Sequence, residues 1–165
     1  MTLRVLIAEQ HTGVRGSLCS MLAADPGIEV VARVDQGAEL LARAMQTLPD
    51  IVCIDIGMPG LNGIEATRSL LASQADVRVI ALSANVDPAA ILELLDAGVA
   101  GYVSCDEGWK GLLRAILGVG RYQKTYLGPS VAADVLVALR AKRRALGALQ
   151  ARAADQGEGR IKQGV

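Results

Sequence analysis

Short runs of apolar, often β-branched residues alternate along the chain with longer segments in which apolar residues recur at helical spacing. Runs that are apolar at successive positions are typical of strands in a parallel sheet that helices cover on both faces. Three strong runs and two weaker ones predict strands at residues 3–8, 29–34, 51–56, 77–82 and 100–104.

The segments between these runs have helical patterns. Asn62 and Asp87 stand where a helix N-cap is expected, and Gly98 stands where a helix should end. Alternating strand–helix units predict an α/β fold with a doubly wound, five-stranded parallel sheet. The helices are expected at residues 12–24, 37–48, 63–74, 88–97 and 107–120.

The pattern changes after Gly120. The expected organisation is a first domain at 1–121, a polar connector at 122–129, an extra C-terminal helix at 130–154 and a flexible tail at 155–165.

The C-terminal helix carries a weak heptad seam, which Lys142 interrupts. The seam is too apolar for a lone helix in water. We therefore expect a homodimer, formed through this helix or through the helices at 88–97 and 107–120. The seam residues are Val135, Leu139, Leu146 and Leu149.

Composition narrows the choice of function. The 17 basic and 17 acidic side chains balance, but residues 1–139 are net acidic and residues 140–165 are net basic. Aromatic residues make up only 2% of the 165 residues and leave no stacking platform for single-stranded nucleic acid. No apolar run is long enough for a membrane span or a signal peptide, so we expect a cytoplasmic protein that does not bind membranes.

The three cysteines, Cys19, Cys53 and Cys105, show neither a disulfide framework nor zinc-site spacing. We interpret Cys19 and Cys53 as small apolar core residues. For His11, the only histidine, we expect a surface or capping role rather than a catalytic one.

Polar residues follow the predicted strands at the edge where ligands of an open parallel sheet bind. Asp55 is the most suggestive, because a carboxylate in the apolar run IVCIDI is costly to bury unless it is solvated or paired. Its position leaves two interpretations open, a loop-capping carboxylate and a nucleophile that accepts a phosphoryl group. The strand-end residues are Glu9, Gln10, Asp55, Gly57, Ser83 and Cys105.

The local sequence favours the second interpretation. DIGMPGLNGIEATR, at 55–68, closely resembles the loop after the phosphorylated aspartate of bacterial response-regulator receiver domains. ALSA at 81–84 and DAGVAGYV at 96–103 are similar to the family's fourth and fifth strands. LLRAILGVGRYQKTYLGPSVAADVL, at 112–136, resembles the connector of the NarL/LuxR-type subgroup, which normally leads into a helix-turn-helix.

The resemblance implies a flavodoxin-like sheet with strand order 2-1-3-4-5. It also implies a role for each matching residue. Asp55 would be the phosphoacceptor, and Ser83 would hydrogen-bond a phosphoryl oxygen. Tyr102 would be the aromatic residue that moves with that hydroxyl. Mg²⁺ would be held by Glu9, Asp55 and the Gly57 carbonyl, with Gln10 as a further candidate.

Two positions depart from the family pattern. Glu9-Gln10 replaces the usual Asp-Asp pair, and Cys105 stands where the family has a lysine. Lys110, five residues further on, is a weak candidate to replace that lysine. We therefore expect weak Mg²⁺ binding and weak or absent phosphorylation of Asp55.

These features favour an atypical receiver module, not an enzyme, that acts through contacts with a sensor kinase or an output protein. The alternative is an ordinary phospho-switched receiver of a DNA-binding transcription regulator whose helix-turn-helix is missing from this chain. DNA binding by the basic segment 140–162 and a redox role for Cys105 are weaker hypotheses.

Overall fold

The computed structural model describes residues 2–84 and 87–161, with side chains of the last helix placed as far as Ala153. The strands are β1 (Leu3–Ala8), β2 (Ile28–Val34), β3 (Ile51–Asp55), β4 (Arg78–Ser83), β5 (Gly101–Ser104) and β6 (Tyr126–Leu127). The helices are α1 (Thr12–Ala23), α2 (Leu40–Thr47), α3 (Gly63–Ser73), α4 (Pro88–Ala97), α5 (Gly108–Tyr122) and α6 (Pro129–Ile161).

The strands form one parallel sheet with the order β2-β1-β3-β4-β5-β6. The predicted order of the first five strands is confirmed, and the count of five was wrong. The connector adds β6 to the edge, where the Tyr126 amide donates to the Ala100 carbonyl (3.0 Å) and the Gly128 amide donates to the Tyr102 carbonyl (3.1 Å). A strand of two residues is too short to show an alternating pattern in the sequence.

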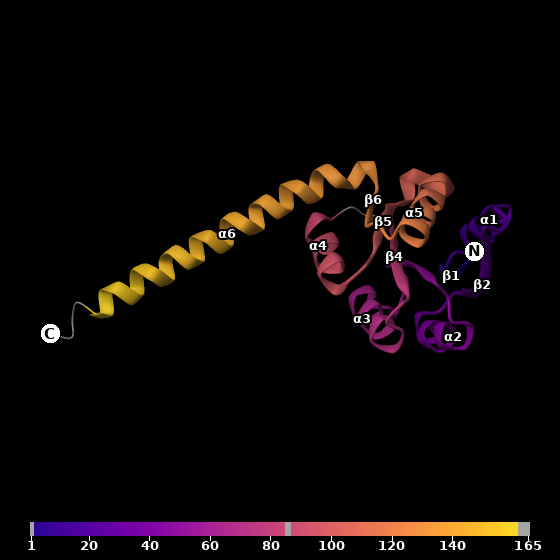
Figure 1. Cartoon of the computed structure of the whole chain (residues 1–165), viewed down its shortest axis with the longest axis horizontal. Coiled ribbons are helices and arrows are strands. Elements are labelled where there is room, and N and C mark those ends of the chain that lie inside the picture. The colour runs from indigo at the N-terminus through magenta and orange to yellow at the C-terminus, as the bar shows by residue number, and fades with distance from the viewer. Residues whose placement is uncertain (1, 85–86, 162–165) are drawn as a thin grey trace.

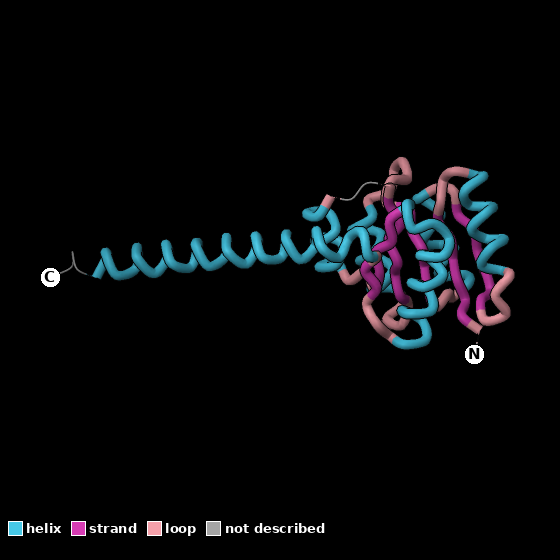
Figure 2. The backbone as a smooth tube through the Cα atoms, turned by 90° about the horizontal axis from the view of Figure 1, so that it is seen from above, coloured by secondary structure: helices cyan, strands magenta, loops and turns pink. Residues whose placement is uncertain are grey.

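Both faces of the sheet are covered, as Figures 1 and 2 show. On one face, Val5 and Ile7 of β1 pack with residues of α1 and α5. On the other face, Leu6 and Ala8 pack with residues of α2, α3 and α4. Successive side chains of a strand point to opposite faces, which explains why the strands have no polar alternation.

The expected helix boundaries are present. The Asn62 side chain accepts hydrogen bonds from two amides of the first turn of α3, and the Asp87 side chain accepts one from Ala89. Gly98 ends α4 in the left-handed conformation, with φ of 103°. The segment predicted as a helix at 37–48 begins with a 3₁₀ turn at Gly37–Glu39, and a second such turn, Cys105–Glu107, precedes α5.

The start of α6 packs against its own domain. Val131 and Val135 are buried, α6 contacts α4 and β5, and Lys142 Nζ lies 2.7 Å from Asp96 Oδ2. The expectation that Val135 belongs to a dimer seam is therefore wrong, because the core of its own domain covers this side chain. The remaining seam residues, Leu139, Leu146 and Leu149, are exposed.

The rest of α6 projects away from the body (Figures 1 and 2). The helix continues to Ile161, beyond the predicted end at residue 154, so residues 155–161, which the prediction assigned to the tail, are helical. Gly157 and Gly159 weaken a helix by about 1 kcal/mol each, but without a proline the hydrogen-bond ladder can continue. Residues 162–165 of the predicted tail lie outside the described residues.

Candidate functional site

Glu9 and Asp55 come together at the carboxyl edge of the sheet. β1 and β3 are direct neighbours, and one ligand atom each from Glu9, His11 and Asp55 lie within 4.8 Å of one another. Ser83 ends the next strand, β4, whose Leu82 is paired with Asp55. The strand ends thus bring the predicted carboxylates and hydroxyl to one region of the molecule.

Glu9 and His11 form a tight pair. Glu9 Oε1 lies 2.7 Å from His11 Nδ1 and accepts a hydrogen bond of the same length from the His11 amide. The Glu9 side chain is 7% exposed and the His11 side chain is 67% exposed. His11 holds the N-cap position of α1, but its side chain makes no capping hydrogen bond. The surface location of His11 was expected. Its side chain does not act as a cap, and its pairing with Glu9 was not predicted.

Arg15 is a further residue that the sequence analysis missed. Its Nη1 donates to the Glu9 carbonyl (2.7 Å) and the Gln10 carbonyl (3.3 Å), and its Nη2 lies 3.5 Å from Asp35 Oδ2. Arg15 follows His11 by one helical turn, a spacing that places it near the end of β1. The guanidinium thus ties the end of β1 to the residue after β2.

The Gly57 carbonyl, an expected metal ligand, already accepts a hydrogen bond. Gln10 Nε2 lies 3.3 Å from this oxygen, and the Gly57 amide donates to Asp55 Oδ1 (2.9 Å). Burial raises the pKa of Asp55, and the Gly57 hydrogen bond opposes that rise. The Glu9 carboxylate raises it further, and the Gln10 side chain lowers it through a hydrogen bond. The Gln10 side chain therefore interacts with Asp55 and with the Gly57 carbonyl, two of the groups that the sequence predicted as metal ligands.

Ser83 and Tyr102 are both buried, and a hydrogen bond joins their side chains. Burial raises the pKa of Tyr102, and this hydrogen bond acts against the rise. Tyr102 lies in β5, whose neighbour β6 leads into α6. The expected switch pair is therefore next to the start of the long helix.

Cys105 is exposed, whereas Cys19 and Cys53 are buried as expected. Burial of part of its side chain raises the pKa of Cys105, and the carboxylates of Asp55 and Glu9 raise it further. The thiol is therefore neutral near pH 7 and supplies no positive charge. A small cavity of about 120 Å³ beside Cys105 is lined in part by Glu9, Leu82 and Leu112.

Lys110, the other candidate for the role of the family lysine, lies over the ring of Trp109. Its Nζ is 5.9 Å from the centroid of the Trp109 ring, and among the described residues it forms no ion pair.

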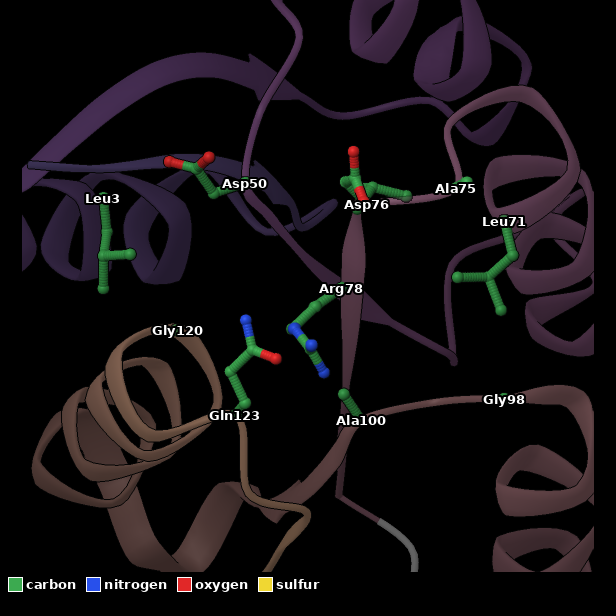
Figure 3. Close-up of a pocket in the computed structure, with 11 residues that line it drawn as sticks. Leu3, Asp50, Leu71, Ala75, Asp76, Arg78, Gly98, Ala100, Gly120 and Gln123 are labelled. Carbon is green, nitrogen blue, oxygen red and sulfur yellow. The ribbon is translucent and has the colours of Figure 1, made fainter.

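A larger cavity of about 440 Å³ lies at the amino edge of the sheet (Figure 3). Asp50, Asp76 and Arg78, which line it, precede or begin strands, whereas Asp55 and Ser83 end them. Asp50 Oδ2 accepts a hydrogen bond from the backbone amide of Arg4 in β1 (2.8 Å). This carboxylate thus ties the residue before β3 to the start of the neighbouring strand. The cavity is therefore separate from the candidate site.

The parallel sheet and the cluster of two carboxylates and an imidazole at its carboxyl edge place the chain in the class of doubly wound α/β domains with a site at the ends of the strands. Within that class, residues 5–116 match the sequence profile of the response regulator receiver domain. The chain belongs to this family, whose members serve in two-component signalling, bind Mg²⁺ at the acidic pocket and interact with kinases and output domains.

Curated relatives include two full response regulators. The chain is 38% identical over 130 residues to response regulator GacA of Pseudomonas viridiflava, and the match covers 79% of this chain and 60% of that protein. It is 34% identical over 137 residues to the DNA-binding transcriptional activator DevR/DosR of Mycobacterium tuberculosis, covering 83% and 63%. The chain thus spans about 60% of the length of GacA.

Solved structures agree with this assignment. A LuxR-family two-component response regulator from Aurantimonas sp. SI85-9A1 has a TM-score of 0.77 at 28% identity, covering 88% of this chain and 99% of that one. The receiver domain of the putative response regulator NarL from Mycobacterium tuberculosis has a TM-score of 0.69 at 27% identity, covering 73% and 97%.

Among the described residues of our chain, no helix has the length and apolar character that crossing a membrane requires.

Proposed function

We propose that this chain is an atypical receiver whose Asp55 is phosphorylated slowly or not at all, and which acts mainly through protein contacts. The observation that carries the proposal is the replacement of the family lysine by Cys105. Phosphoryl transfer depends on positive charge beside the transferring group. The Cys105 thiol lies in the field of Asp55 and Glu9, and its raised pKa keeps it neutral.

The residues at the expected magnesium site support the same proposal. Gln10 removes one carboxylate from the pocket, and its amide donates to the Gly57 carbonyl. Mg²⁺ needs near-octahedral oxygen ligands and gives up its waters reluctantly. Two carboxylates and a carbonyl that is already hydrogen-bonded make a poor magnesium site, so Mg²⁺ binding should be weak.

Phosphorylation by acetyl phosphate tests the proposal. An oxygen of Asp55 would attack phosphorus, and the bond from phosphorus to the bridging oxygen would break to release acetate. In excess Mg²⁺, we expect little gain of the phosphoryl mass, about 80 Da, in the unaltered protein. The double variant Gln10→Asp, Cys105→Lys should label at least about tenfold faster, since about 1.4 kcal/mol of restored stabilisation is a factor of ten in rate.

Two controls identify the acceptor and the cause. Asp55→Asn in the double variant should abolish labelling, and Cys105→Ser alone should leave the slow rate unchanged. Fast, Mg²⁺-dependent labelling of the unaltered protein would refute the proposal and favour an ordinary phospho-switch. An unlabelled double variant would show that these two positions are not what limits transfer.

A further inference from the structure

We infer that this pocket binds a transition-metal dication, of the Zn²⁺ or Co²⁺ kind, in preference to Mg²⁺, with Glu9, His11 and Asp55 as ligands. The inference deepens the proposed function, on which it rests, because it concerns the same pocket. It starts from the poor fit between the residues present and the magnesium ion that receiver domains hold there.

The geometry brings an imidazole into the carboxylate cluster. One ligand atom from each of the three side chains lies within 4.8 Å of the others, and Glu9 Oε1 is 2.7 Å from His11 Nδ1. Metal–ligand bonds of about 2.0–2.2 Å place neighbouring ligand atoms roughly 3–3.5 Å apart. Small movements of the exposed His11 side chain therefore suffice to convert the hydrogen-bonded pair into two ligands of one ion.

The three proposed ligand side chains differ in how firmly the surrounding structure holds them. The Glu9 side chain is 7% exposed and Arg15 holds its backbone carbonyl, so this carboxylate is fixed at the end of β1. The Gly57 amide donates to one oxygen of Asp55, and the Gln10 side chain also hydrogen-bonds this carboxylate, so a metal ion would have to displace or share the Gln10 contact. His11 is the N-cap residue before α1, and its exposed side chain approaches both carboxylates from the solvent side.

The donor set determines which ion is preferred. Imidazole nitrogen suits zinc, cobalt, nickel and copper, whereas magnesium prefers carboxylate, carbonyl and water oxygens. The exchange of a family carboxylate for Gln10 weakens the attraction for magnesium, and the imidazole beside Glu9 offers a donor that magnesium uses poorly. Gln10 also donates to the Gly57 carbonyl through its Nε2, 3.3 Å away, so an ion at this oxygen would share it with the amide.

Titration of the full chain without an affinity tag tests the inference. Co²⁺ is the probe, since its visible absorption reports coordination, and calorimetry gives the affinities of Co²⁺, Zn²⁺ and Mg²⁺. We expect one Co²⁺ per chain and a tighter affinity than for Mg²⁺. His11→Gln should weaken Co²⁺ binding at least tenfold to a hundredfold, roughly the loss that removing a residue behind a ligand already causes, and change Mg²⁺ binding by less than about twofold. Cys105→Ser is the matched control and should leave Co²⁺ binding unchanged.

A second measurement does not depend on any variant. His11 is the only histidine, so one imidazole signal in the NMR spectrum reports the site, and one equivalent of Zn²⁺ should shift it. An unshifted imidazole, a thiolate-to-cobalt absorption band that Cys105→Ser removes, or equal affinities for Mg²⁺ and Co²⁺ would each overturn the inference. Absent cobalt binding together with slow phosphorylation would overturn only this inference, whereas fast phosphorylation in Mg²⁺ would refute the proposed function itself.

Discussion

At the scale of single residues, the pocket is dominated by negative charge at its centre. Asp55 and Glu9 each raise the pKa of Cys105, and Glu9 also raises the pKa of Asp55. His11 and Arg15 lie beside the same strand end, but they contact Glu9 and the backbone rather than the thiol. Cys105 should therefore be a poor nucleophile although it is exposed.

Alkylation of Cys105 measures this charge directly. Asp55→Asn removes a neighbouring negative charge, which lowers the pKa of the thiol and increases the thiolate fraction near pH 8. One pKa unit is a factor of ten in that fraction, so we expect alkylation about two- to tenfold faster. The rate is followed by intact mass with N-ethylmaleimide.

The control is Asp76→Asn, at the amino edge of the sheet, which should leave the rate unchanged. The buried Cys19 and Cys53 should stay unmodified in the folded protein, which limits labelling to one thiol. Equal rates for the Asp55→Asn variant and the unaltered protein would contradict the electrostatic account of Cys105.

The positions of the site residues were predictable from the sequence, but some of their side-chain contacts were not. The meeting of Glu9 and Asp55 was predictable, because neighbouring parallel strands end at one edge and fix their last residues. The bond from Gln10 to Gly57 and the pairing of His11 with Glu9 were not. They depend on side-chain torsions in loops that no strand or helix pattern specifies.

At the scale of elements, close approach between helix and sheet decides where a side chain is tolerated. A Cβ atom at Gly120 of α5 would lie 2.7 Å from Leu3 Cδ1 and 3.0 Å from Ile51 Cδ1, which belong to β1 and β3. Ile51 is fully buried and cannot move aside freely, whereas the Leu3 side chain also borders the cavity of Figure 3. In α6, a Cβ atom at Gly147 would meet nothing within 4 Å.

Two alanine substitutions make use of this contrast. Gly120→Ala should destabilise the fold, because overpacking costs about 1–3 kcal/mol and the gain in helix propensity is at most about 1 kcal/mol. Urea unfolding followed by circular dichroism gives the change in the free energy of unfolding. Gly147→Ala is the matched control and should raise helical content without lowering that free energy. A Gly120→Ala protein as stable as the unaltered one would mean that α5 packs less closely on the sheet.

The elements also differ in how well their patterns predict them. β1 to β5 were all predicted within one residue of their observed ends, because each is an apolar run bounded by polar or glycine residues. β6 was missed because only tertiary pairing with β5 makes a strand of two residues. The end of α6 was placed too early because glycines lower helix propensity without preventing a helix.

At the scale of the whole molecule, the body and the projecting helix have opposite charge and different exposure. Val131 and Val135 anchor α6 on the domain, and Lys142 pairs with Asp96. Leu139, Leu146 and Leu149 continue the same helix face, since steps of three, four and seven residues return to it, but they are exposed. An apolar stripe on a helix beyond the domain needs a partner in water.

We predict that this exposed part of the stripe pairs with α6 of a second chain. Leu146→Glu places a charge in the middle of that contact and should convert a dimer into a monomer at tens of micromolar protein in sedimentation velocity. Val137→Glu is the matched control, because Val137 is 64% exposed on a different face of α6, and it should leave the dimer intact.

Arg140, Arg143 and Arg144 bring like charges near the contact, so higher salt should screen their repulsion and strengthen the dimer. A monomer at these concentrations, or equal dissociation by both variants, would show that the stripe does not join two copies.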